Sequence, residues 1–363
     1  MNWLLIFLGF SLLIILHEAG HFLTAKATGM RVERFFLFFG PTIWSFRRGE
    51  TEYGVKAIPL GGYVKITGMN PEEEIPPEVE DRAYYRQPVW KRIAVIAAGP
   101  VVNIVLAFAI LFFVFLLNAQ EPTQKVSEIS GGTPAAKVLR PGDRIVAVDG
   151  RSYSTLDPTE RVDRFREQIA SHECAGKRVD GCLAATPVIL EIERDGRVET
   201  ISVRPEYDAP AQRTLIGFRY GSRPIDIGAG TAADQAGDAV WAVTSGTLHV
   251  FSHLFEAQQR EQVSGIVGVS DVANQTLDES VERSLLLLAL VSLSLGIINL
   301  LPILPLDGGH IFWSLVEKLR GRPVSLRVME RASVIGLALV LMLFVLGLSN
   351  DIGRLGGDEL KVR

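Results

Sequence analysis

The sequence predicts a polytopic α-helical membrane protein with about four transmembrane helices, a membrane-associated β element and one inserted extracytoplasmic α+β domain. Hydrophobic residues make up 48% of the 363 residues, against 21% for charged residues. The apolar residues cluster in four stretches, each near the ~20 residues that a helix needs to cross ~30 Å of hydrocarbon. Polar segments with short alternating runs and turn residues lie between these stretches.

These observations divide the chain into consecutive segments. The predicted order is a first span at 1–24, a cytoplasmic-side loop with the β element at 25–92, a second span at 93–117, an extracytoplasmic domain at 118–208, a linker at 209–284, a third span at 285–311, a cytoplasmic loop at 312–330, a fourth span at 331–349 and a C-terminal tail at 350–363.

The first span carries no charge from Trp3 to Leu16 and then reads His17-Glu18-Ala19-Gly20-His21. An N-terminal apolar run can also be a secretory signal peptide. Here no Lys or Arg precedes the run and no small-x-small cleavage site follows it, so we expect the segment to be retained as a span. Ionisable residues at membrane depth are costly and mark function by default.

The basic residues near the span ends predict the orientation, because Lys and Arg stay on the cytoplasmic side. They gather in two segments, after the first span and before the last: Lys26, Arg31, Arg34, Arg47, Arg48, Lys91 and Arg92, and then Lys318, Arg320, Arg322, Arg327 and Arg331. The sequence therefore predicts that both segments are cytoplasmic, and that the N-terminus, the 118–284 segment and the C-terminus are extracytoplasmic.

The segment from 31 to 68 consists of short apolar and aromatic runs interrupted by Gly40-Pro41, Gly49 and Gly61-Gly62. This pattern indicates strands joined by turns rather than a helix. The many aromatic residues either anchor these strands at the membrane interface or form the buried face of a small sheet.

The segment from 118 to 208 has the punctuation of a separate globular domain. Residues 140–150 read as a Pro-Gly-Asp turn, an alternating strand and an Asp-Gly turn, and residues 188–203 read as a hairpin. Cys174 and Cys182 lie in the same segment. A disulfide between them is plausible outside a reducing cytosol, and two free thiols are the alternative.

The linker that follows contains apolar residues at near-helical spacing. They predict an amphipathic helix over about Ala232–Gln259 that lies along the outer membrane surface, with an apolar face that includes Val240, Val243, Leu248, Phe251 and Phe255.

The residues that carry chemistry are His17, Glu18, His21 and Asp307. On a helix, two histidines at i and i+4 lie on one face, so both imidazoles can reach a single tetrahedral metal ion with the glutamate beside it. Catalytic zinc sites usually have three protein ligands, and Asp307 is the strong candidate for the third because its apolar surroundings hold two prolines and two glycines that would bend the backbone. The alternative is that Asp307 caps the helix after the third span.

These motifs resemble those of the site-2 protease family, the intramembrane zinc metalloproteases of regulated intramembrane proteolysis. The family combines H-E-x-x-H on one span with N-x-x-P-x-x-x-x-D-G on a later span, here Asn299 through Pro302 to Asp307-Gly308. The resemblance implies one Zn²⁺ per chain, Glu18 as the catalytic base and, as zinc ligands, His17, His21 and Asp307.

Two further elements are similar to family motifs. Residues 99–103, Gly-Pro-Val-Val-Asn, are similar to the family's G-P-x-x-N, and residues 61–64, Gly-Gly-Tyr-Val, resemble a family loop whose β element pairs with unwound substrate. The resemblance implies that the residues that position the substrate are Asn103, Asn299, Gly61 and Gly62.

The 118–208 segment resembles a PDZ domain of the bacterial kind. In such domains a G-x-P-A-A helix, here at 132–136, precedes a P-G-D-x-I-x-x-V-D-G strand, here at 141–150. PDZ domains bind extended peptides by strand addition, so a peptide or protein ligand is expected. A spacer that binds nothing is the alternative.

The resemblance implies an enzyme of the inner (plasma) membrane that hydrolyses peptide bonds within transmembrane segments of single-span proteins. Anti-sigma-factor-like regulators or remnant signal peptides, already cut by a site-1 protease, would be its substrates. The lipid bilayer is a further expected partner, and no nucleic-acid partner is expected. The alternatives are a catalytically inert PDZ-bearing scaffold and a metal transporter, which would need ionisable residues across several spans.

Overall fold

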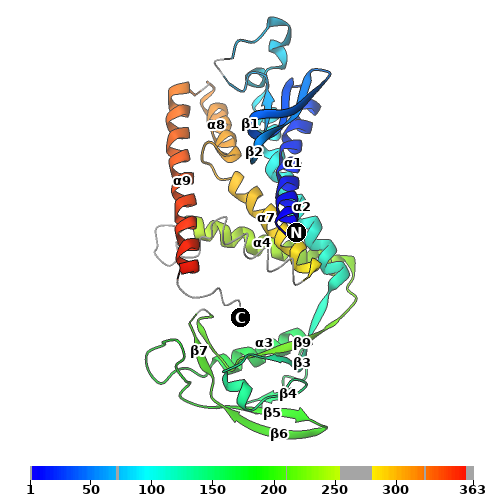
Figure 1. Cartoon of the computed structure of the whole chain (residues 1–363), viewed down its shortest axis with the longest axis vertical. Coiled ribbons are helices and arrows are strands. Elements are labelled where there is room, and N and C mark those ends of the chain that lie inside the picture. Colours follow the sequence, from blue (N-terminus) through cyan, green and yellow to red (C-terminus); the bar gives the residue numbers. More distant parts are fainter. Residues whose placement is uncertain (1, 71–72, 210, 254–279, 323, 357–363) are drawn as a thin grey trace. The chain divides into compact units, whose positions relative to one another are not determined.

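The computed structural model describes residues 2–70, 73–209, 211–253, 280–322 and 324–356. The described residues form two compact units, one made of the residues up to Leu116 together with those of 228–253, 280–322 and 324–356, and the other of Leu117–Ile227. Figure 1 shows the first unit as mainly helical and the second as a sheet with one long helix.

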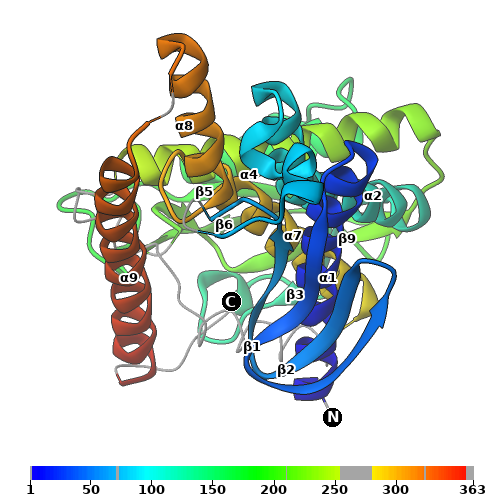
Figure 2. The same cartoon turned by 90° about the horizontal axis from the view of Figure 1, so that it is seen from above.

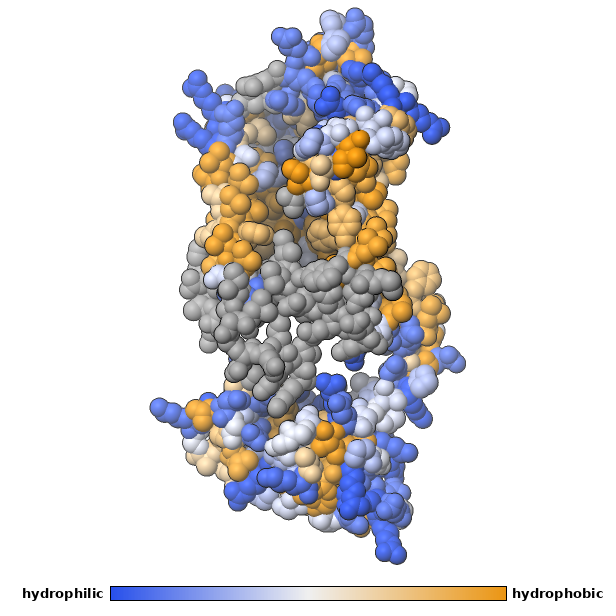
Figure 3. Space-filling view, in the orientation of Figure 1, coloured by the Kyte–Doolittle hydropathy of each residue, from blue (hydrophilic) through white to orange (hydrophobic). Residues whose placement is uncertain are grey.

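Four helices among the described residues are long and apolar enough to cross a membrane: α1 (Asn2–Ala27), α2 (Val89–Asn118), α7 (Val281–Asn299) and α9 (Leu326–Gly356). Many of their large apolar side chains are exposed, as expected of surfaces that face lipid. Figure 3 shows apolar residues gathered on these helices and polar residues at one end of the unit. The prediction of about four membrane-length helices is confirmed.

The predicted third span is too long, and the predicted loop after it is largely helical. Helix α7 ends at Asn299, and residues 300–306 form a turn with a cis peptide bond between Leu304 and Pro305. Helix α8 (Asp307–Arg320) then occupies much of the segment expected as a loop at 312–330. Proline has no backbone N–H and clashes with the preceding turn, so the two prolines separate α7 from α8.

Helix α9 also differs from its prediction, since it extends beyond 331–349 at both ends and into the predicted tail.

The β element consists of two long, irregular strands, β1 (Val32–Arg48) and β2 (Thr51–Ile66), which pair with each other. Residues 34–37 each have two partners, so that Leu37, for example, pairs with both Val55 and Gly62. Each strand therefore folds back along itself, at the positions where Gly40 (φ 84°) and Gly61 (φ 85°) adopt left-handed backbone. Figure 2 shows the element beside α1, with which both strands are in contact.

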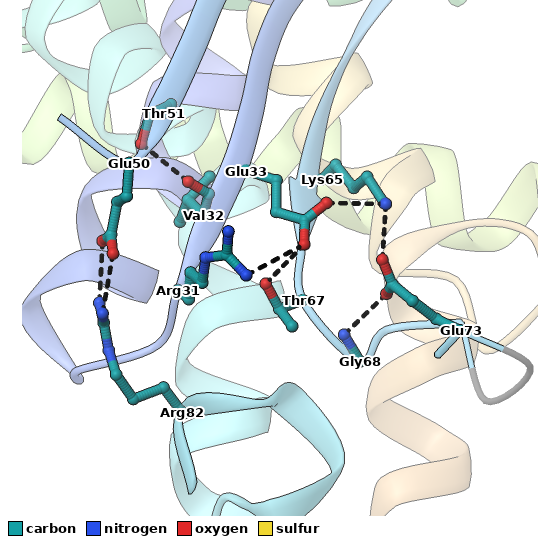
Figure 4. A network of polar contacts seen from close by, with 10 residues as sticks. All are labelled: Arg31, Val32, Glu33, Glu50, Thr51, Lys65, Thr67, Gly68, Glu73 and Arg82. Carbon is teal, nitrogen blue, oxygen red and sulfur yellow. Dashed lines mark hydrogen bonds and ion pairs between the residues drawn. The ribbon is translucent and has the colours of Figure 1, made fainter. Parts of the chain in front are cut away.

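A network of ion pairs holds the base of this β element (Figure 4). The Glu33 carboxylate contacts Lys65 Nζ at 2.7 Å and accepts a hydrogen bond of 3.0 Å from Thr67 Oγ1. Lys65 also contacts Glu73 at 2.6 Å, and Arg82 forms two hydrogen bonds of 2.8 Å with Glu50. The network connects both strands to the segment that leads into α2.

The second unit is built on a five-stranded sheet whose strand order is β6-β5-β4-β3-β9. Its elements are β3 (Gln120–Ile129), η3 (Pro134–Lys137), β4 (Arg144–Val148), α3 (Pro158–Ala170), β5 (Val188–Arg194), β6 (Arg197–Val203), the short pair β7 (Glu206–Asp208) and β8 (Arg213–Leu215), and β9 (Phe218–Pro224). The core lies between the sheet and α3 and includes Ile145, Phe165, Leu190 and Ile192.

The predicted boundary of this domain at residue 208 is wrong. Strand β9 pairs with β3, and Tyr220 lies opposite Val126, so the unit continues to Ile227. The first part of the predicted linker at 209–284 therefore belongs to this unit and contains β8 and the edge strand β9. This pairing joins segments far apart in the sequence, which a local pattern does not reveal.

The predicted amphipathic helix is present as α4 (Ala229–Ser252). Its apolar face does not stand alone, because Ala236, Val240 and Val243 pack with Leu111 of α2 and Leu293 of α7. The end of the predicted helix, including Phe255, lies outside the described residues.

Candidate metal centre

The two histidines of the H-E-x-x-H motif lie one turn apart on α1, and both are buried. Their Nε2 atoms are 3.3 Å from each other. Nδ1 of His21 lies 2.8 Å from the carbonyl oxygen of Val95 on α2. Because a carbonyl can only accept, this bond places the hydrogen on Nδ1 and leaves a lone pair on Nε2.

Asp307 completes a triangle of donor atoms. Its Oδ2 atom lies 3.2 Å from His17 Nε2 and 3.4 Å from His21 Nε2. A tetrahedral ion with bonds of about 2.0–2.1 Å holds neighbouring ligand atoms about 3.4 Å apart, so the three separations match one face of such a tetrahedron. Within the described ranges, these three residues form a group of His, Cys, Asp or Glu side chains whose donor atoms lie close enough together to share a metal ion.

The alternative role of Asp307, as a helix cap, does not fit its position. Asp307 is the first residue of α8, the N-cap position is Leu306, and this N-cap residue makes no side-chain capping hydrogen bond. The turn before Asp307 is tight, since a Cβ on Gly308 would lie 2.2 Å from the carbonyl oxygen of Leu300. This close approach directs the first turn of α8 toward the histidines.

Gly99 of α2 leaves space for a metal ion. A Cβ at this position would lie 2.3 Å from His21 Nε2 and 2.9 Å from His17 Nε2. A side chain there would fill the space in front of both nitrogens, which a bound ion must occupy. A similar contact brings the two helices together, because a Cβ on Gly20 would lie 2.6 Å from the carbonyl oxygen of Ala98.

Glu18 lies outside the donor triangle, between α1 and the β element. A Cβ on Gly62 would lie 3.0 Å from Cγ of Glu18, so the strand backbone passes directly over this side chain. Neighbouring Gly61 has a φ of 85°, which allows the strand to change direction there. The structure thus brings Glu18, Gly61 and Gly62 together beside the histidines.

The two asparagines have different surroundings. Asn103 lies one turn beyond Gly99 on α2 and is fully buried, and its side-chain amide has no hydrogen-bond partner among the described residues. Asn299 ends α7, and its Nδ2 donates a hydrogen bond of 3.0 Å to the carbonyl oxygen of Leu295 in its own helix.

Cys174 and Cys182 lie in the other unit, where the structure joins them by a disulfide. They are therefore separate from the metal-binding group.

Two contributors to this centre are not apparent from the sequence. The carbonyl of Val95 orients His21, and Gly99 provides space at the Nε2 atoms. Gly99 belongs to a recognisable Gly-Pro pair, but nothing in the local pattern indicates which side chains it faces.

Comparison with known proteins identifies the family. The model of Peptidase family M50 matches residues 5–343. Zinc metalloprotease Rip1 of Mycobacterium tuberculosis is 34% identical, with 86% of this chain and 85% of the relative covered. Zinc metalloprotease Rip1 of Mycolicibacterium smegmatis is also 34% identical, with 88% and 86% covered.

A solved PDZ domain, from an SdrC-like protein of Listeria innocua, is 22% identical and covers 27% of this chain and 92% of its own length. Its TM-score of 0.20 is too low to support a comparison of folds. By contrast, the family model and the Rip1 relatives each match most of the chain. The chain therefore belongs to Peptidase family M50, the site-2 proteases, and is a metalloprotease.

Proposed function

We propose that this protein is an intramembrane zinc metalloendopeptidase that cuts peptide bonds within the transmembrane segments of single-span membrane proteins. The observation that carries the proposal is the set of three donor atoms that lie 3.2–3.4 Å from one another, two of them on the membrane-length helix α1. Gly99 leaves open the space that the metal ion would occupy. The cofactor is Zn²⁺. Its ligands are His17, His21 and Asp307, with one ion per chain.

Held by His17, His21 and Asp307, a Zn²⁺ ion would supply a Lewis acid that could lower the pKa of water to about 7 and polarise the scissile carbonyl. Glu18 takes the proton of the attacking water and passes it to the leaving amine nitrogen. Two neutral imidazoles and one carboxylate leave a single positive charge at the centre, which the Glu18 carboxylate offsets. The Val95 carbonyl keeps His21 in the tautomer that this arrangement needs.

A transmembrane helix hides its peptide bonds, so the substrate must unwind before it is cut. Residues 62–66 of β2 have partners on one side, residues 32–37, and Gly62 lies against Glu18. An extended substrate segment that added to the other side would lie beside the catalytic base. Gly61 and Gly62 have no side chains, so a substrate segment can approach the backbone of this strand closely. The buried, unpaired side-chain amide of Asn103 binds the substrate backbone. The side-chain oxygen of Asn299 takes no part in the hydrogen bond from Nδ2 to Leu295, and it also binds the substrate backbone.

The proposed topology follows the basic residues. The centre lies toward the cytoplasmic side of the inner membrane, about 15 Å before the end of α1 at 1.5 Å per residue. The N-terminus, the Leu117–Ile227 unit and the C-terminus are extracytoplasmic. The disulfide in this unit is consistent with that side of the membrane.

We assign the Leu117–Ile227 unit to the PDZ type, with a peptide or protein ligand. Support comes from its five-stranded sheet, its single long helix α3 and the short η3 helix that precedes β4. Substrates of the enzyme are anti-sigma-factor-like regulators or remnant signal peptides that a site-1 protease has already trimmed.

The test is a reconstituted cleavage assay with a single-span substrate, combined with zinc content by elemental analysis. Glu18→Gln should abolish cleavage and keep one zinc per chain, whereas Asp307→Asn should lose both. Glu74→Gln, which alters an exposed carboxylate in the segment before α2, is the matched control and should retain both. Cleavage that persists in Glu18→Gln, or zinc at full stoichiometry in Asp307→Asn, would overturn the assignment.

A further inference from the structure

Helix α8 carries Asp307 at its start and is fastened to the rest of the unit along one side. Ile311 packs against the buried cluster of α1, α2 and the β element, Ser314 is buried, and Glu317 reaches Arg92 of α2. Residues four, seven and ten positions after Asp307 lie on nearly the same side of a helix. The side of α8 that docks is therefore also the side that presents Asp307 to the histidines.

The contact between Arg92 and Glu317 is the most specific of these. Nη1 of Arg92 donates to Oε2 of Glu317 at 3.0 Å, and Nη2 donates to Oε1 at 2.6 Å. The Arg92 side chain is 9% exposed, and its guanidinium lies 5.8 Å from the centre of the Tyr84 ring. A buried, two-point contact of this kind fixes orientation as well as distance.

Tyr84 belongs to the buried cluster that holds a second point on α8, because Ile311 packs against this cluster. The two contacts, at Ile311 and Glu317, hold separate positions of one helix face against α2 and the segment before it. Rotation of α8 about its own axis would break both.

Helix α2 contributes to the metal centre through the same side. Arg92, Val95 and Gly99 follow one another at i, i+3 and i+7, so they line one face of α2. Arg92 holds α8, Val95 holds His21, and Gly99 leaves the space between the ligands. A single face of one helix therefore fixes ligands that come from two other helices.

We infer that Arg92 and Glu317 are positioning residues, whose ion pair sets the rotation of α8 and so keeps the Asp307 carboxylate beside His17 and His21. The inference rests on the proposed role of Asp307 as a zinc ligand. It predicts that loss of the pair weakens zinc binding, although neither residue approaches the ion.

The test measures the zinc dissociation constant of the full-length protein in detergent, by competition with a chromogenic chelator. Glu317→Gln should weaken zinc binding by roughly 10-fold, within the 10- to 100-fold range known for groups that orient ligands. It should lower kcat with little change in KM, because the substrate site is intact. Lys318→Gln is the matched control, because it also removes one charge, from the exposed residue next to Glu317. It should leave zinc affinity unchanged.

Loss of one partner leaves a buried charge unpaired, and this could also affect folding. The exchanged pair, Arg92→Glu with Glu317→Arg, separates the two effects and should restore zinc affinity to within about threefold of wild type, as the pair's attraction is retained. The inference is overturned if folded Glu317→Gln binds zinc as wild type does. It is equally overturned if the exchanged pair folds but keeps the full loss.

Asp307→Asn provides the arm that separates this inference from the proposed function. If Asp307→Asn loses zinc affinity and Glu317→Gln does not, only the positioning role is wrong. If Asp307→Asn binds zinc normally, the ligand assignment itself is wrong.

Discussion

At the scale of single residues, the space in front of the two histidines depends on Gly99. We predict that Gly99→Ala weakens zinc binding by more than roughly 100-fold and abolishes cleavage, because its Cβ would lie 2.3 Å from His21 Nε2. Helix propensity cannot explain such a loss, since Gly to Ala within a helix favours the helix by about 0.5–1 kcal/mol. Zinc content and cleavage rate of the purified variant check this.

Gly9→Ala is the matched control for that substitution. It introduces the same methyl group on α1, where the new Cβ would lie 3.5 Å from Leu288 Cδ1, an ordinary contact. Zinc content and cleavage should remain at the wild-type level. A Gly99→Ala protein with full zinc content would show that the histidine nitrogens do not share an ion at this position.

The ligand candidates could be named from the sequence, and their orienting groups could not. His17 and His21 are separated by one helical turn, and the spacing alone places them on one face. Asp307 is identifiable because a carboxylate is rare in such apolar sequence. Val95 and Gly99 act through a backbone carbonyl and an absent side chain, and both depend on how α2 packs against α1. Contacts of this kind between separate helices leave no periodic signal.

At the scale of elements, the base of the β element should respond to pH. Burial raises the pKa of Glu33, but hydrogen bonds from Lys65 and Thr67 lower it by more, so its pKa lies below the usual value. The unfolded carboxyl titrates near about 4.3. The ion pair therefore stabilises the element above that pH, and this stabilisation is lost as the pH falls through the lower folded pKa.

We expect the β element of wild type to become more accessible to an acid-tolerant protease as the pH falls below about 4.3. In Glu33→Gln, accessibility should be higher at pH 7 and should change less with pH, because only one of the two carboxylates that contact Lys65, that of Glu73, remains. Glu74→Gln, which changes an exposed carboxylate nearby, should behave as wild type. Equal accessibility of the wild-type element at pH 7 and pH 3 would contradict the role assigned to Glu33.

The sequence identifies the elements better than it identifies their limits. The apolar runs predict α1, α2, α7 and α9, and the glycines at 40, 49 and 61 mark where the β element turns. The break between α7 and α8 was expected to be a bend, but the two prolines separate two helices. Strand β9 was missed because its partner β3 lies far away in the sequence.

At the scale of the whole molecule, two units with separate cores occur in one chain. The buried cluster of the α/β unit is formed by residues of that unit alone, including Phe165, Leu190 and Ile216. All the residues of the metal centre belong to the other unit. Removal of the α/β unit can therefore test whether this unit takes part in the choice of substrate.

The points at which the α/β unit leaves and rejoins the chain are adjacent. Gln120 pairs with Pro224, and the backbone N–H of Ile225 donates a hydrogen bond of 3.0 Å to the carbonyl oxygen of Ala119. A short Gly-Ser link can therefore replace residues 120–224 without stretching either flank. A deletion of 118–208, the domain limits that the sequence predicts, would leave β9 without its partner strand β3.

We predict that the chain lacking residues 120–224 keeps one zinc ion per chain and still cuts a trimmed single-span substrate in a Glu18-dependent way. Its preference for trimmed over untrimmed substrate should change by about tenfold, the effect of about 1.4 kcal/mol of binding energy from the missing unit. The control keeps the unit and carries the same Gly-Ser link after Pro224. Loss of zinc from the deletion chain would show that the units do not fold independently, and an unchanged substrate preference would exclude the α/β unit from substrate choice.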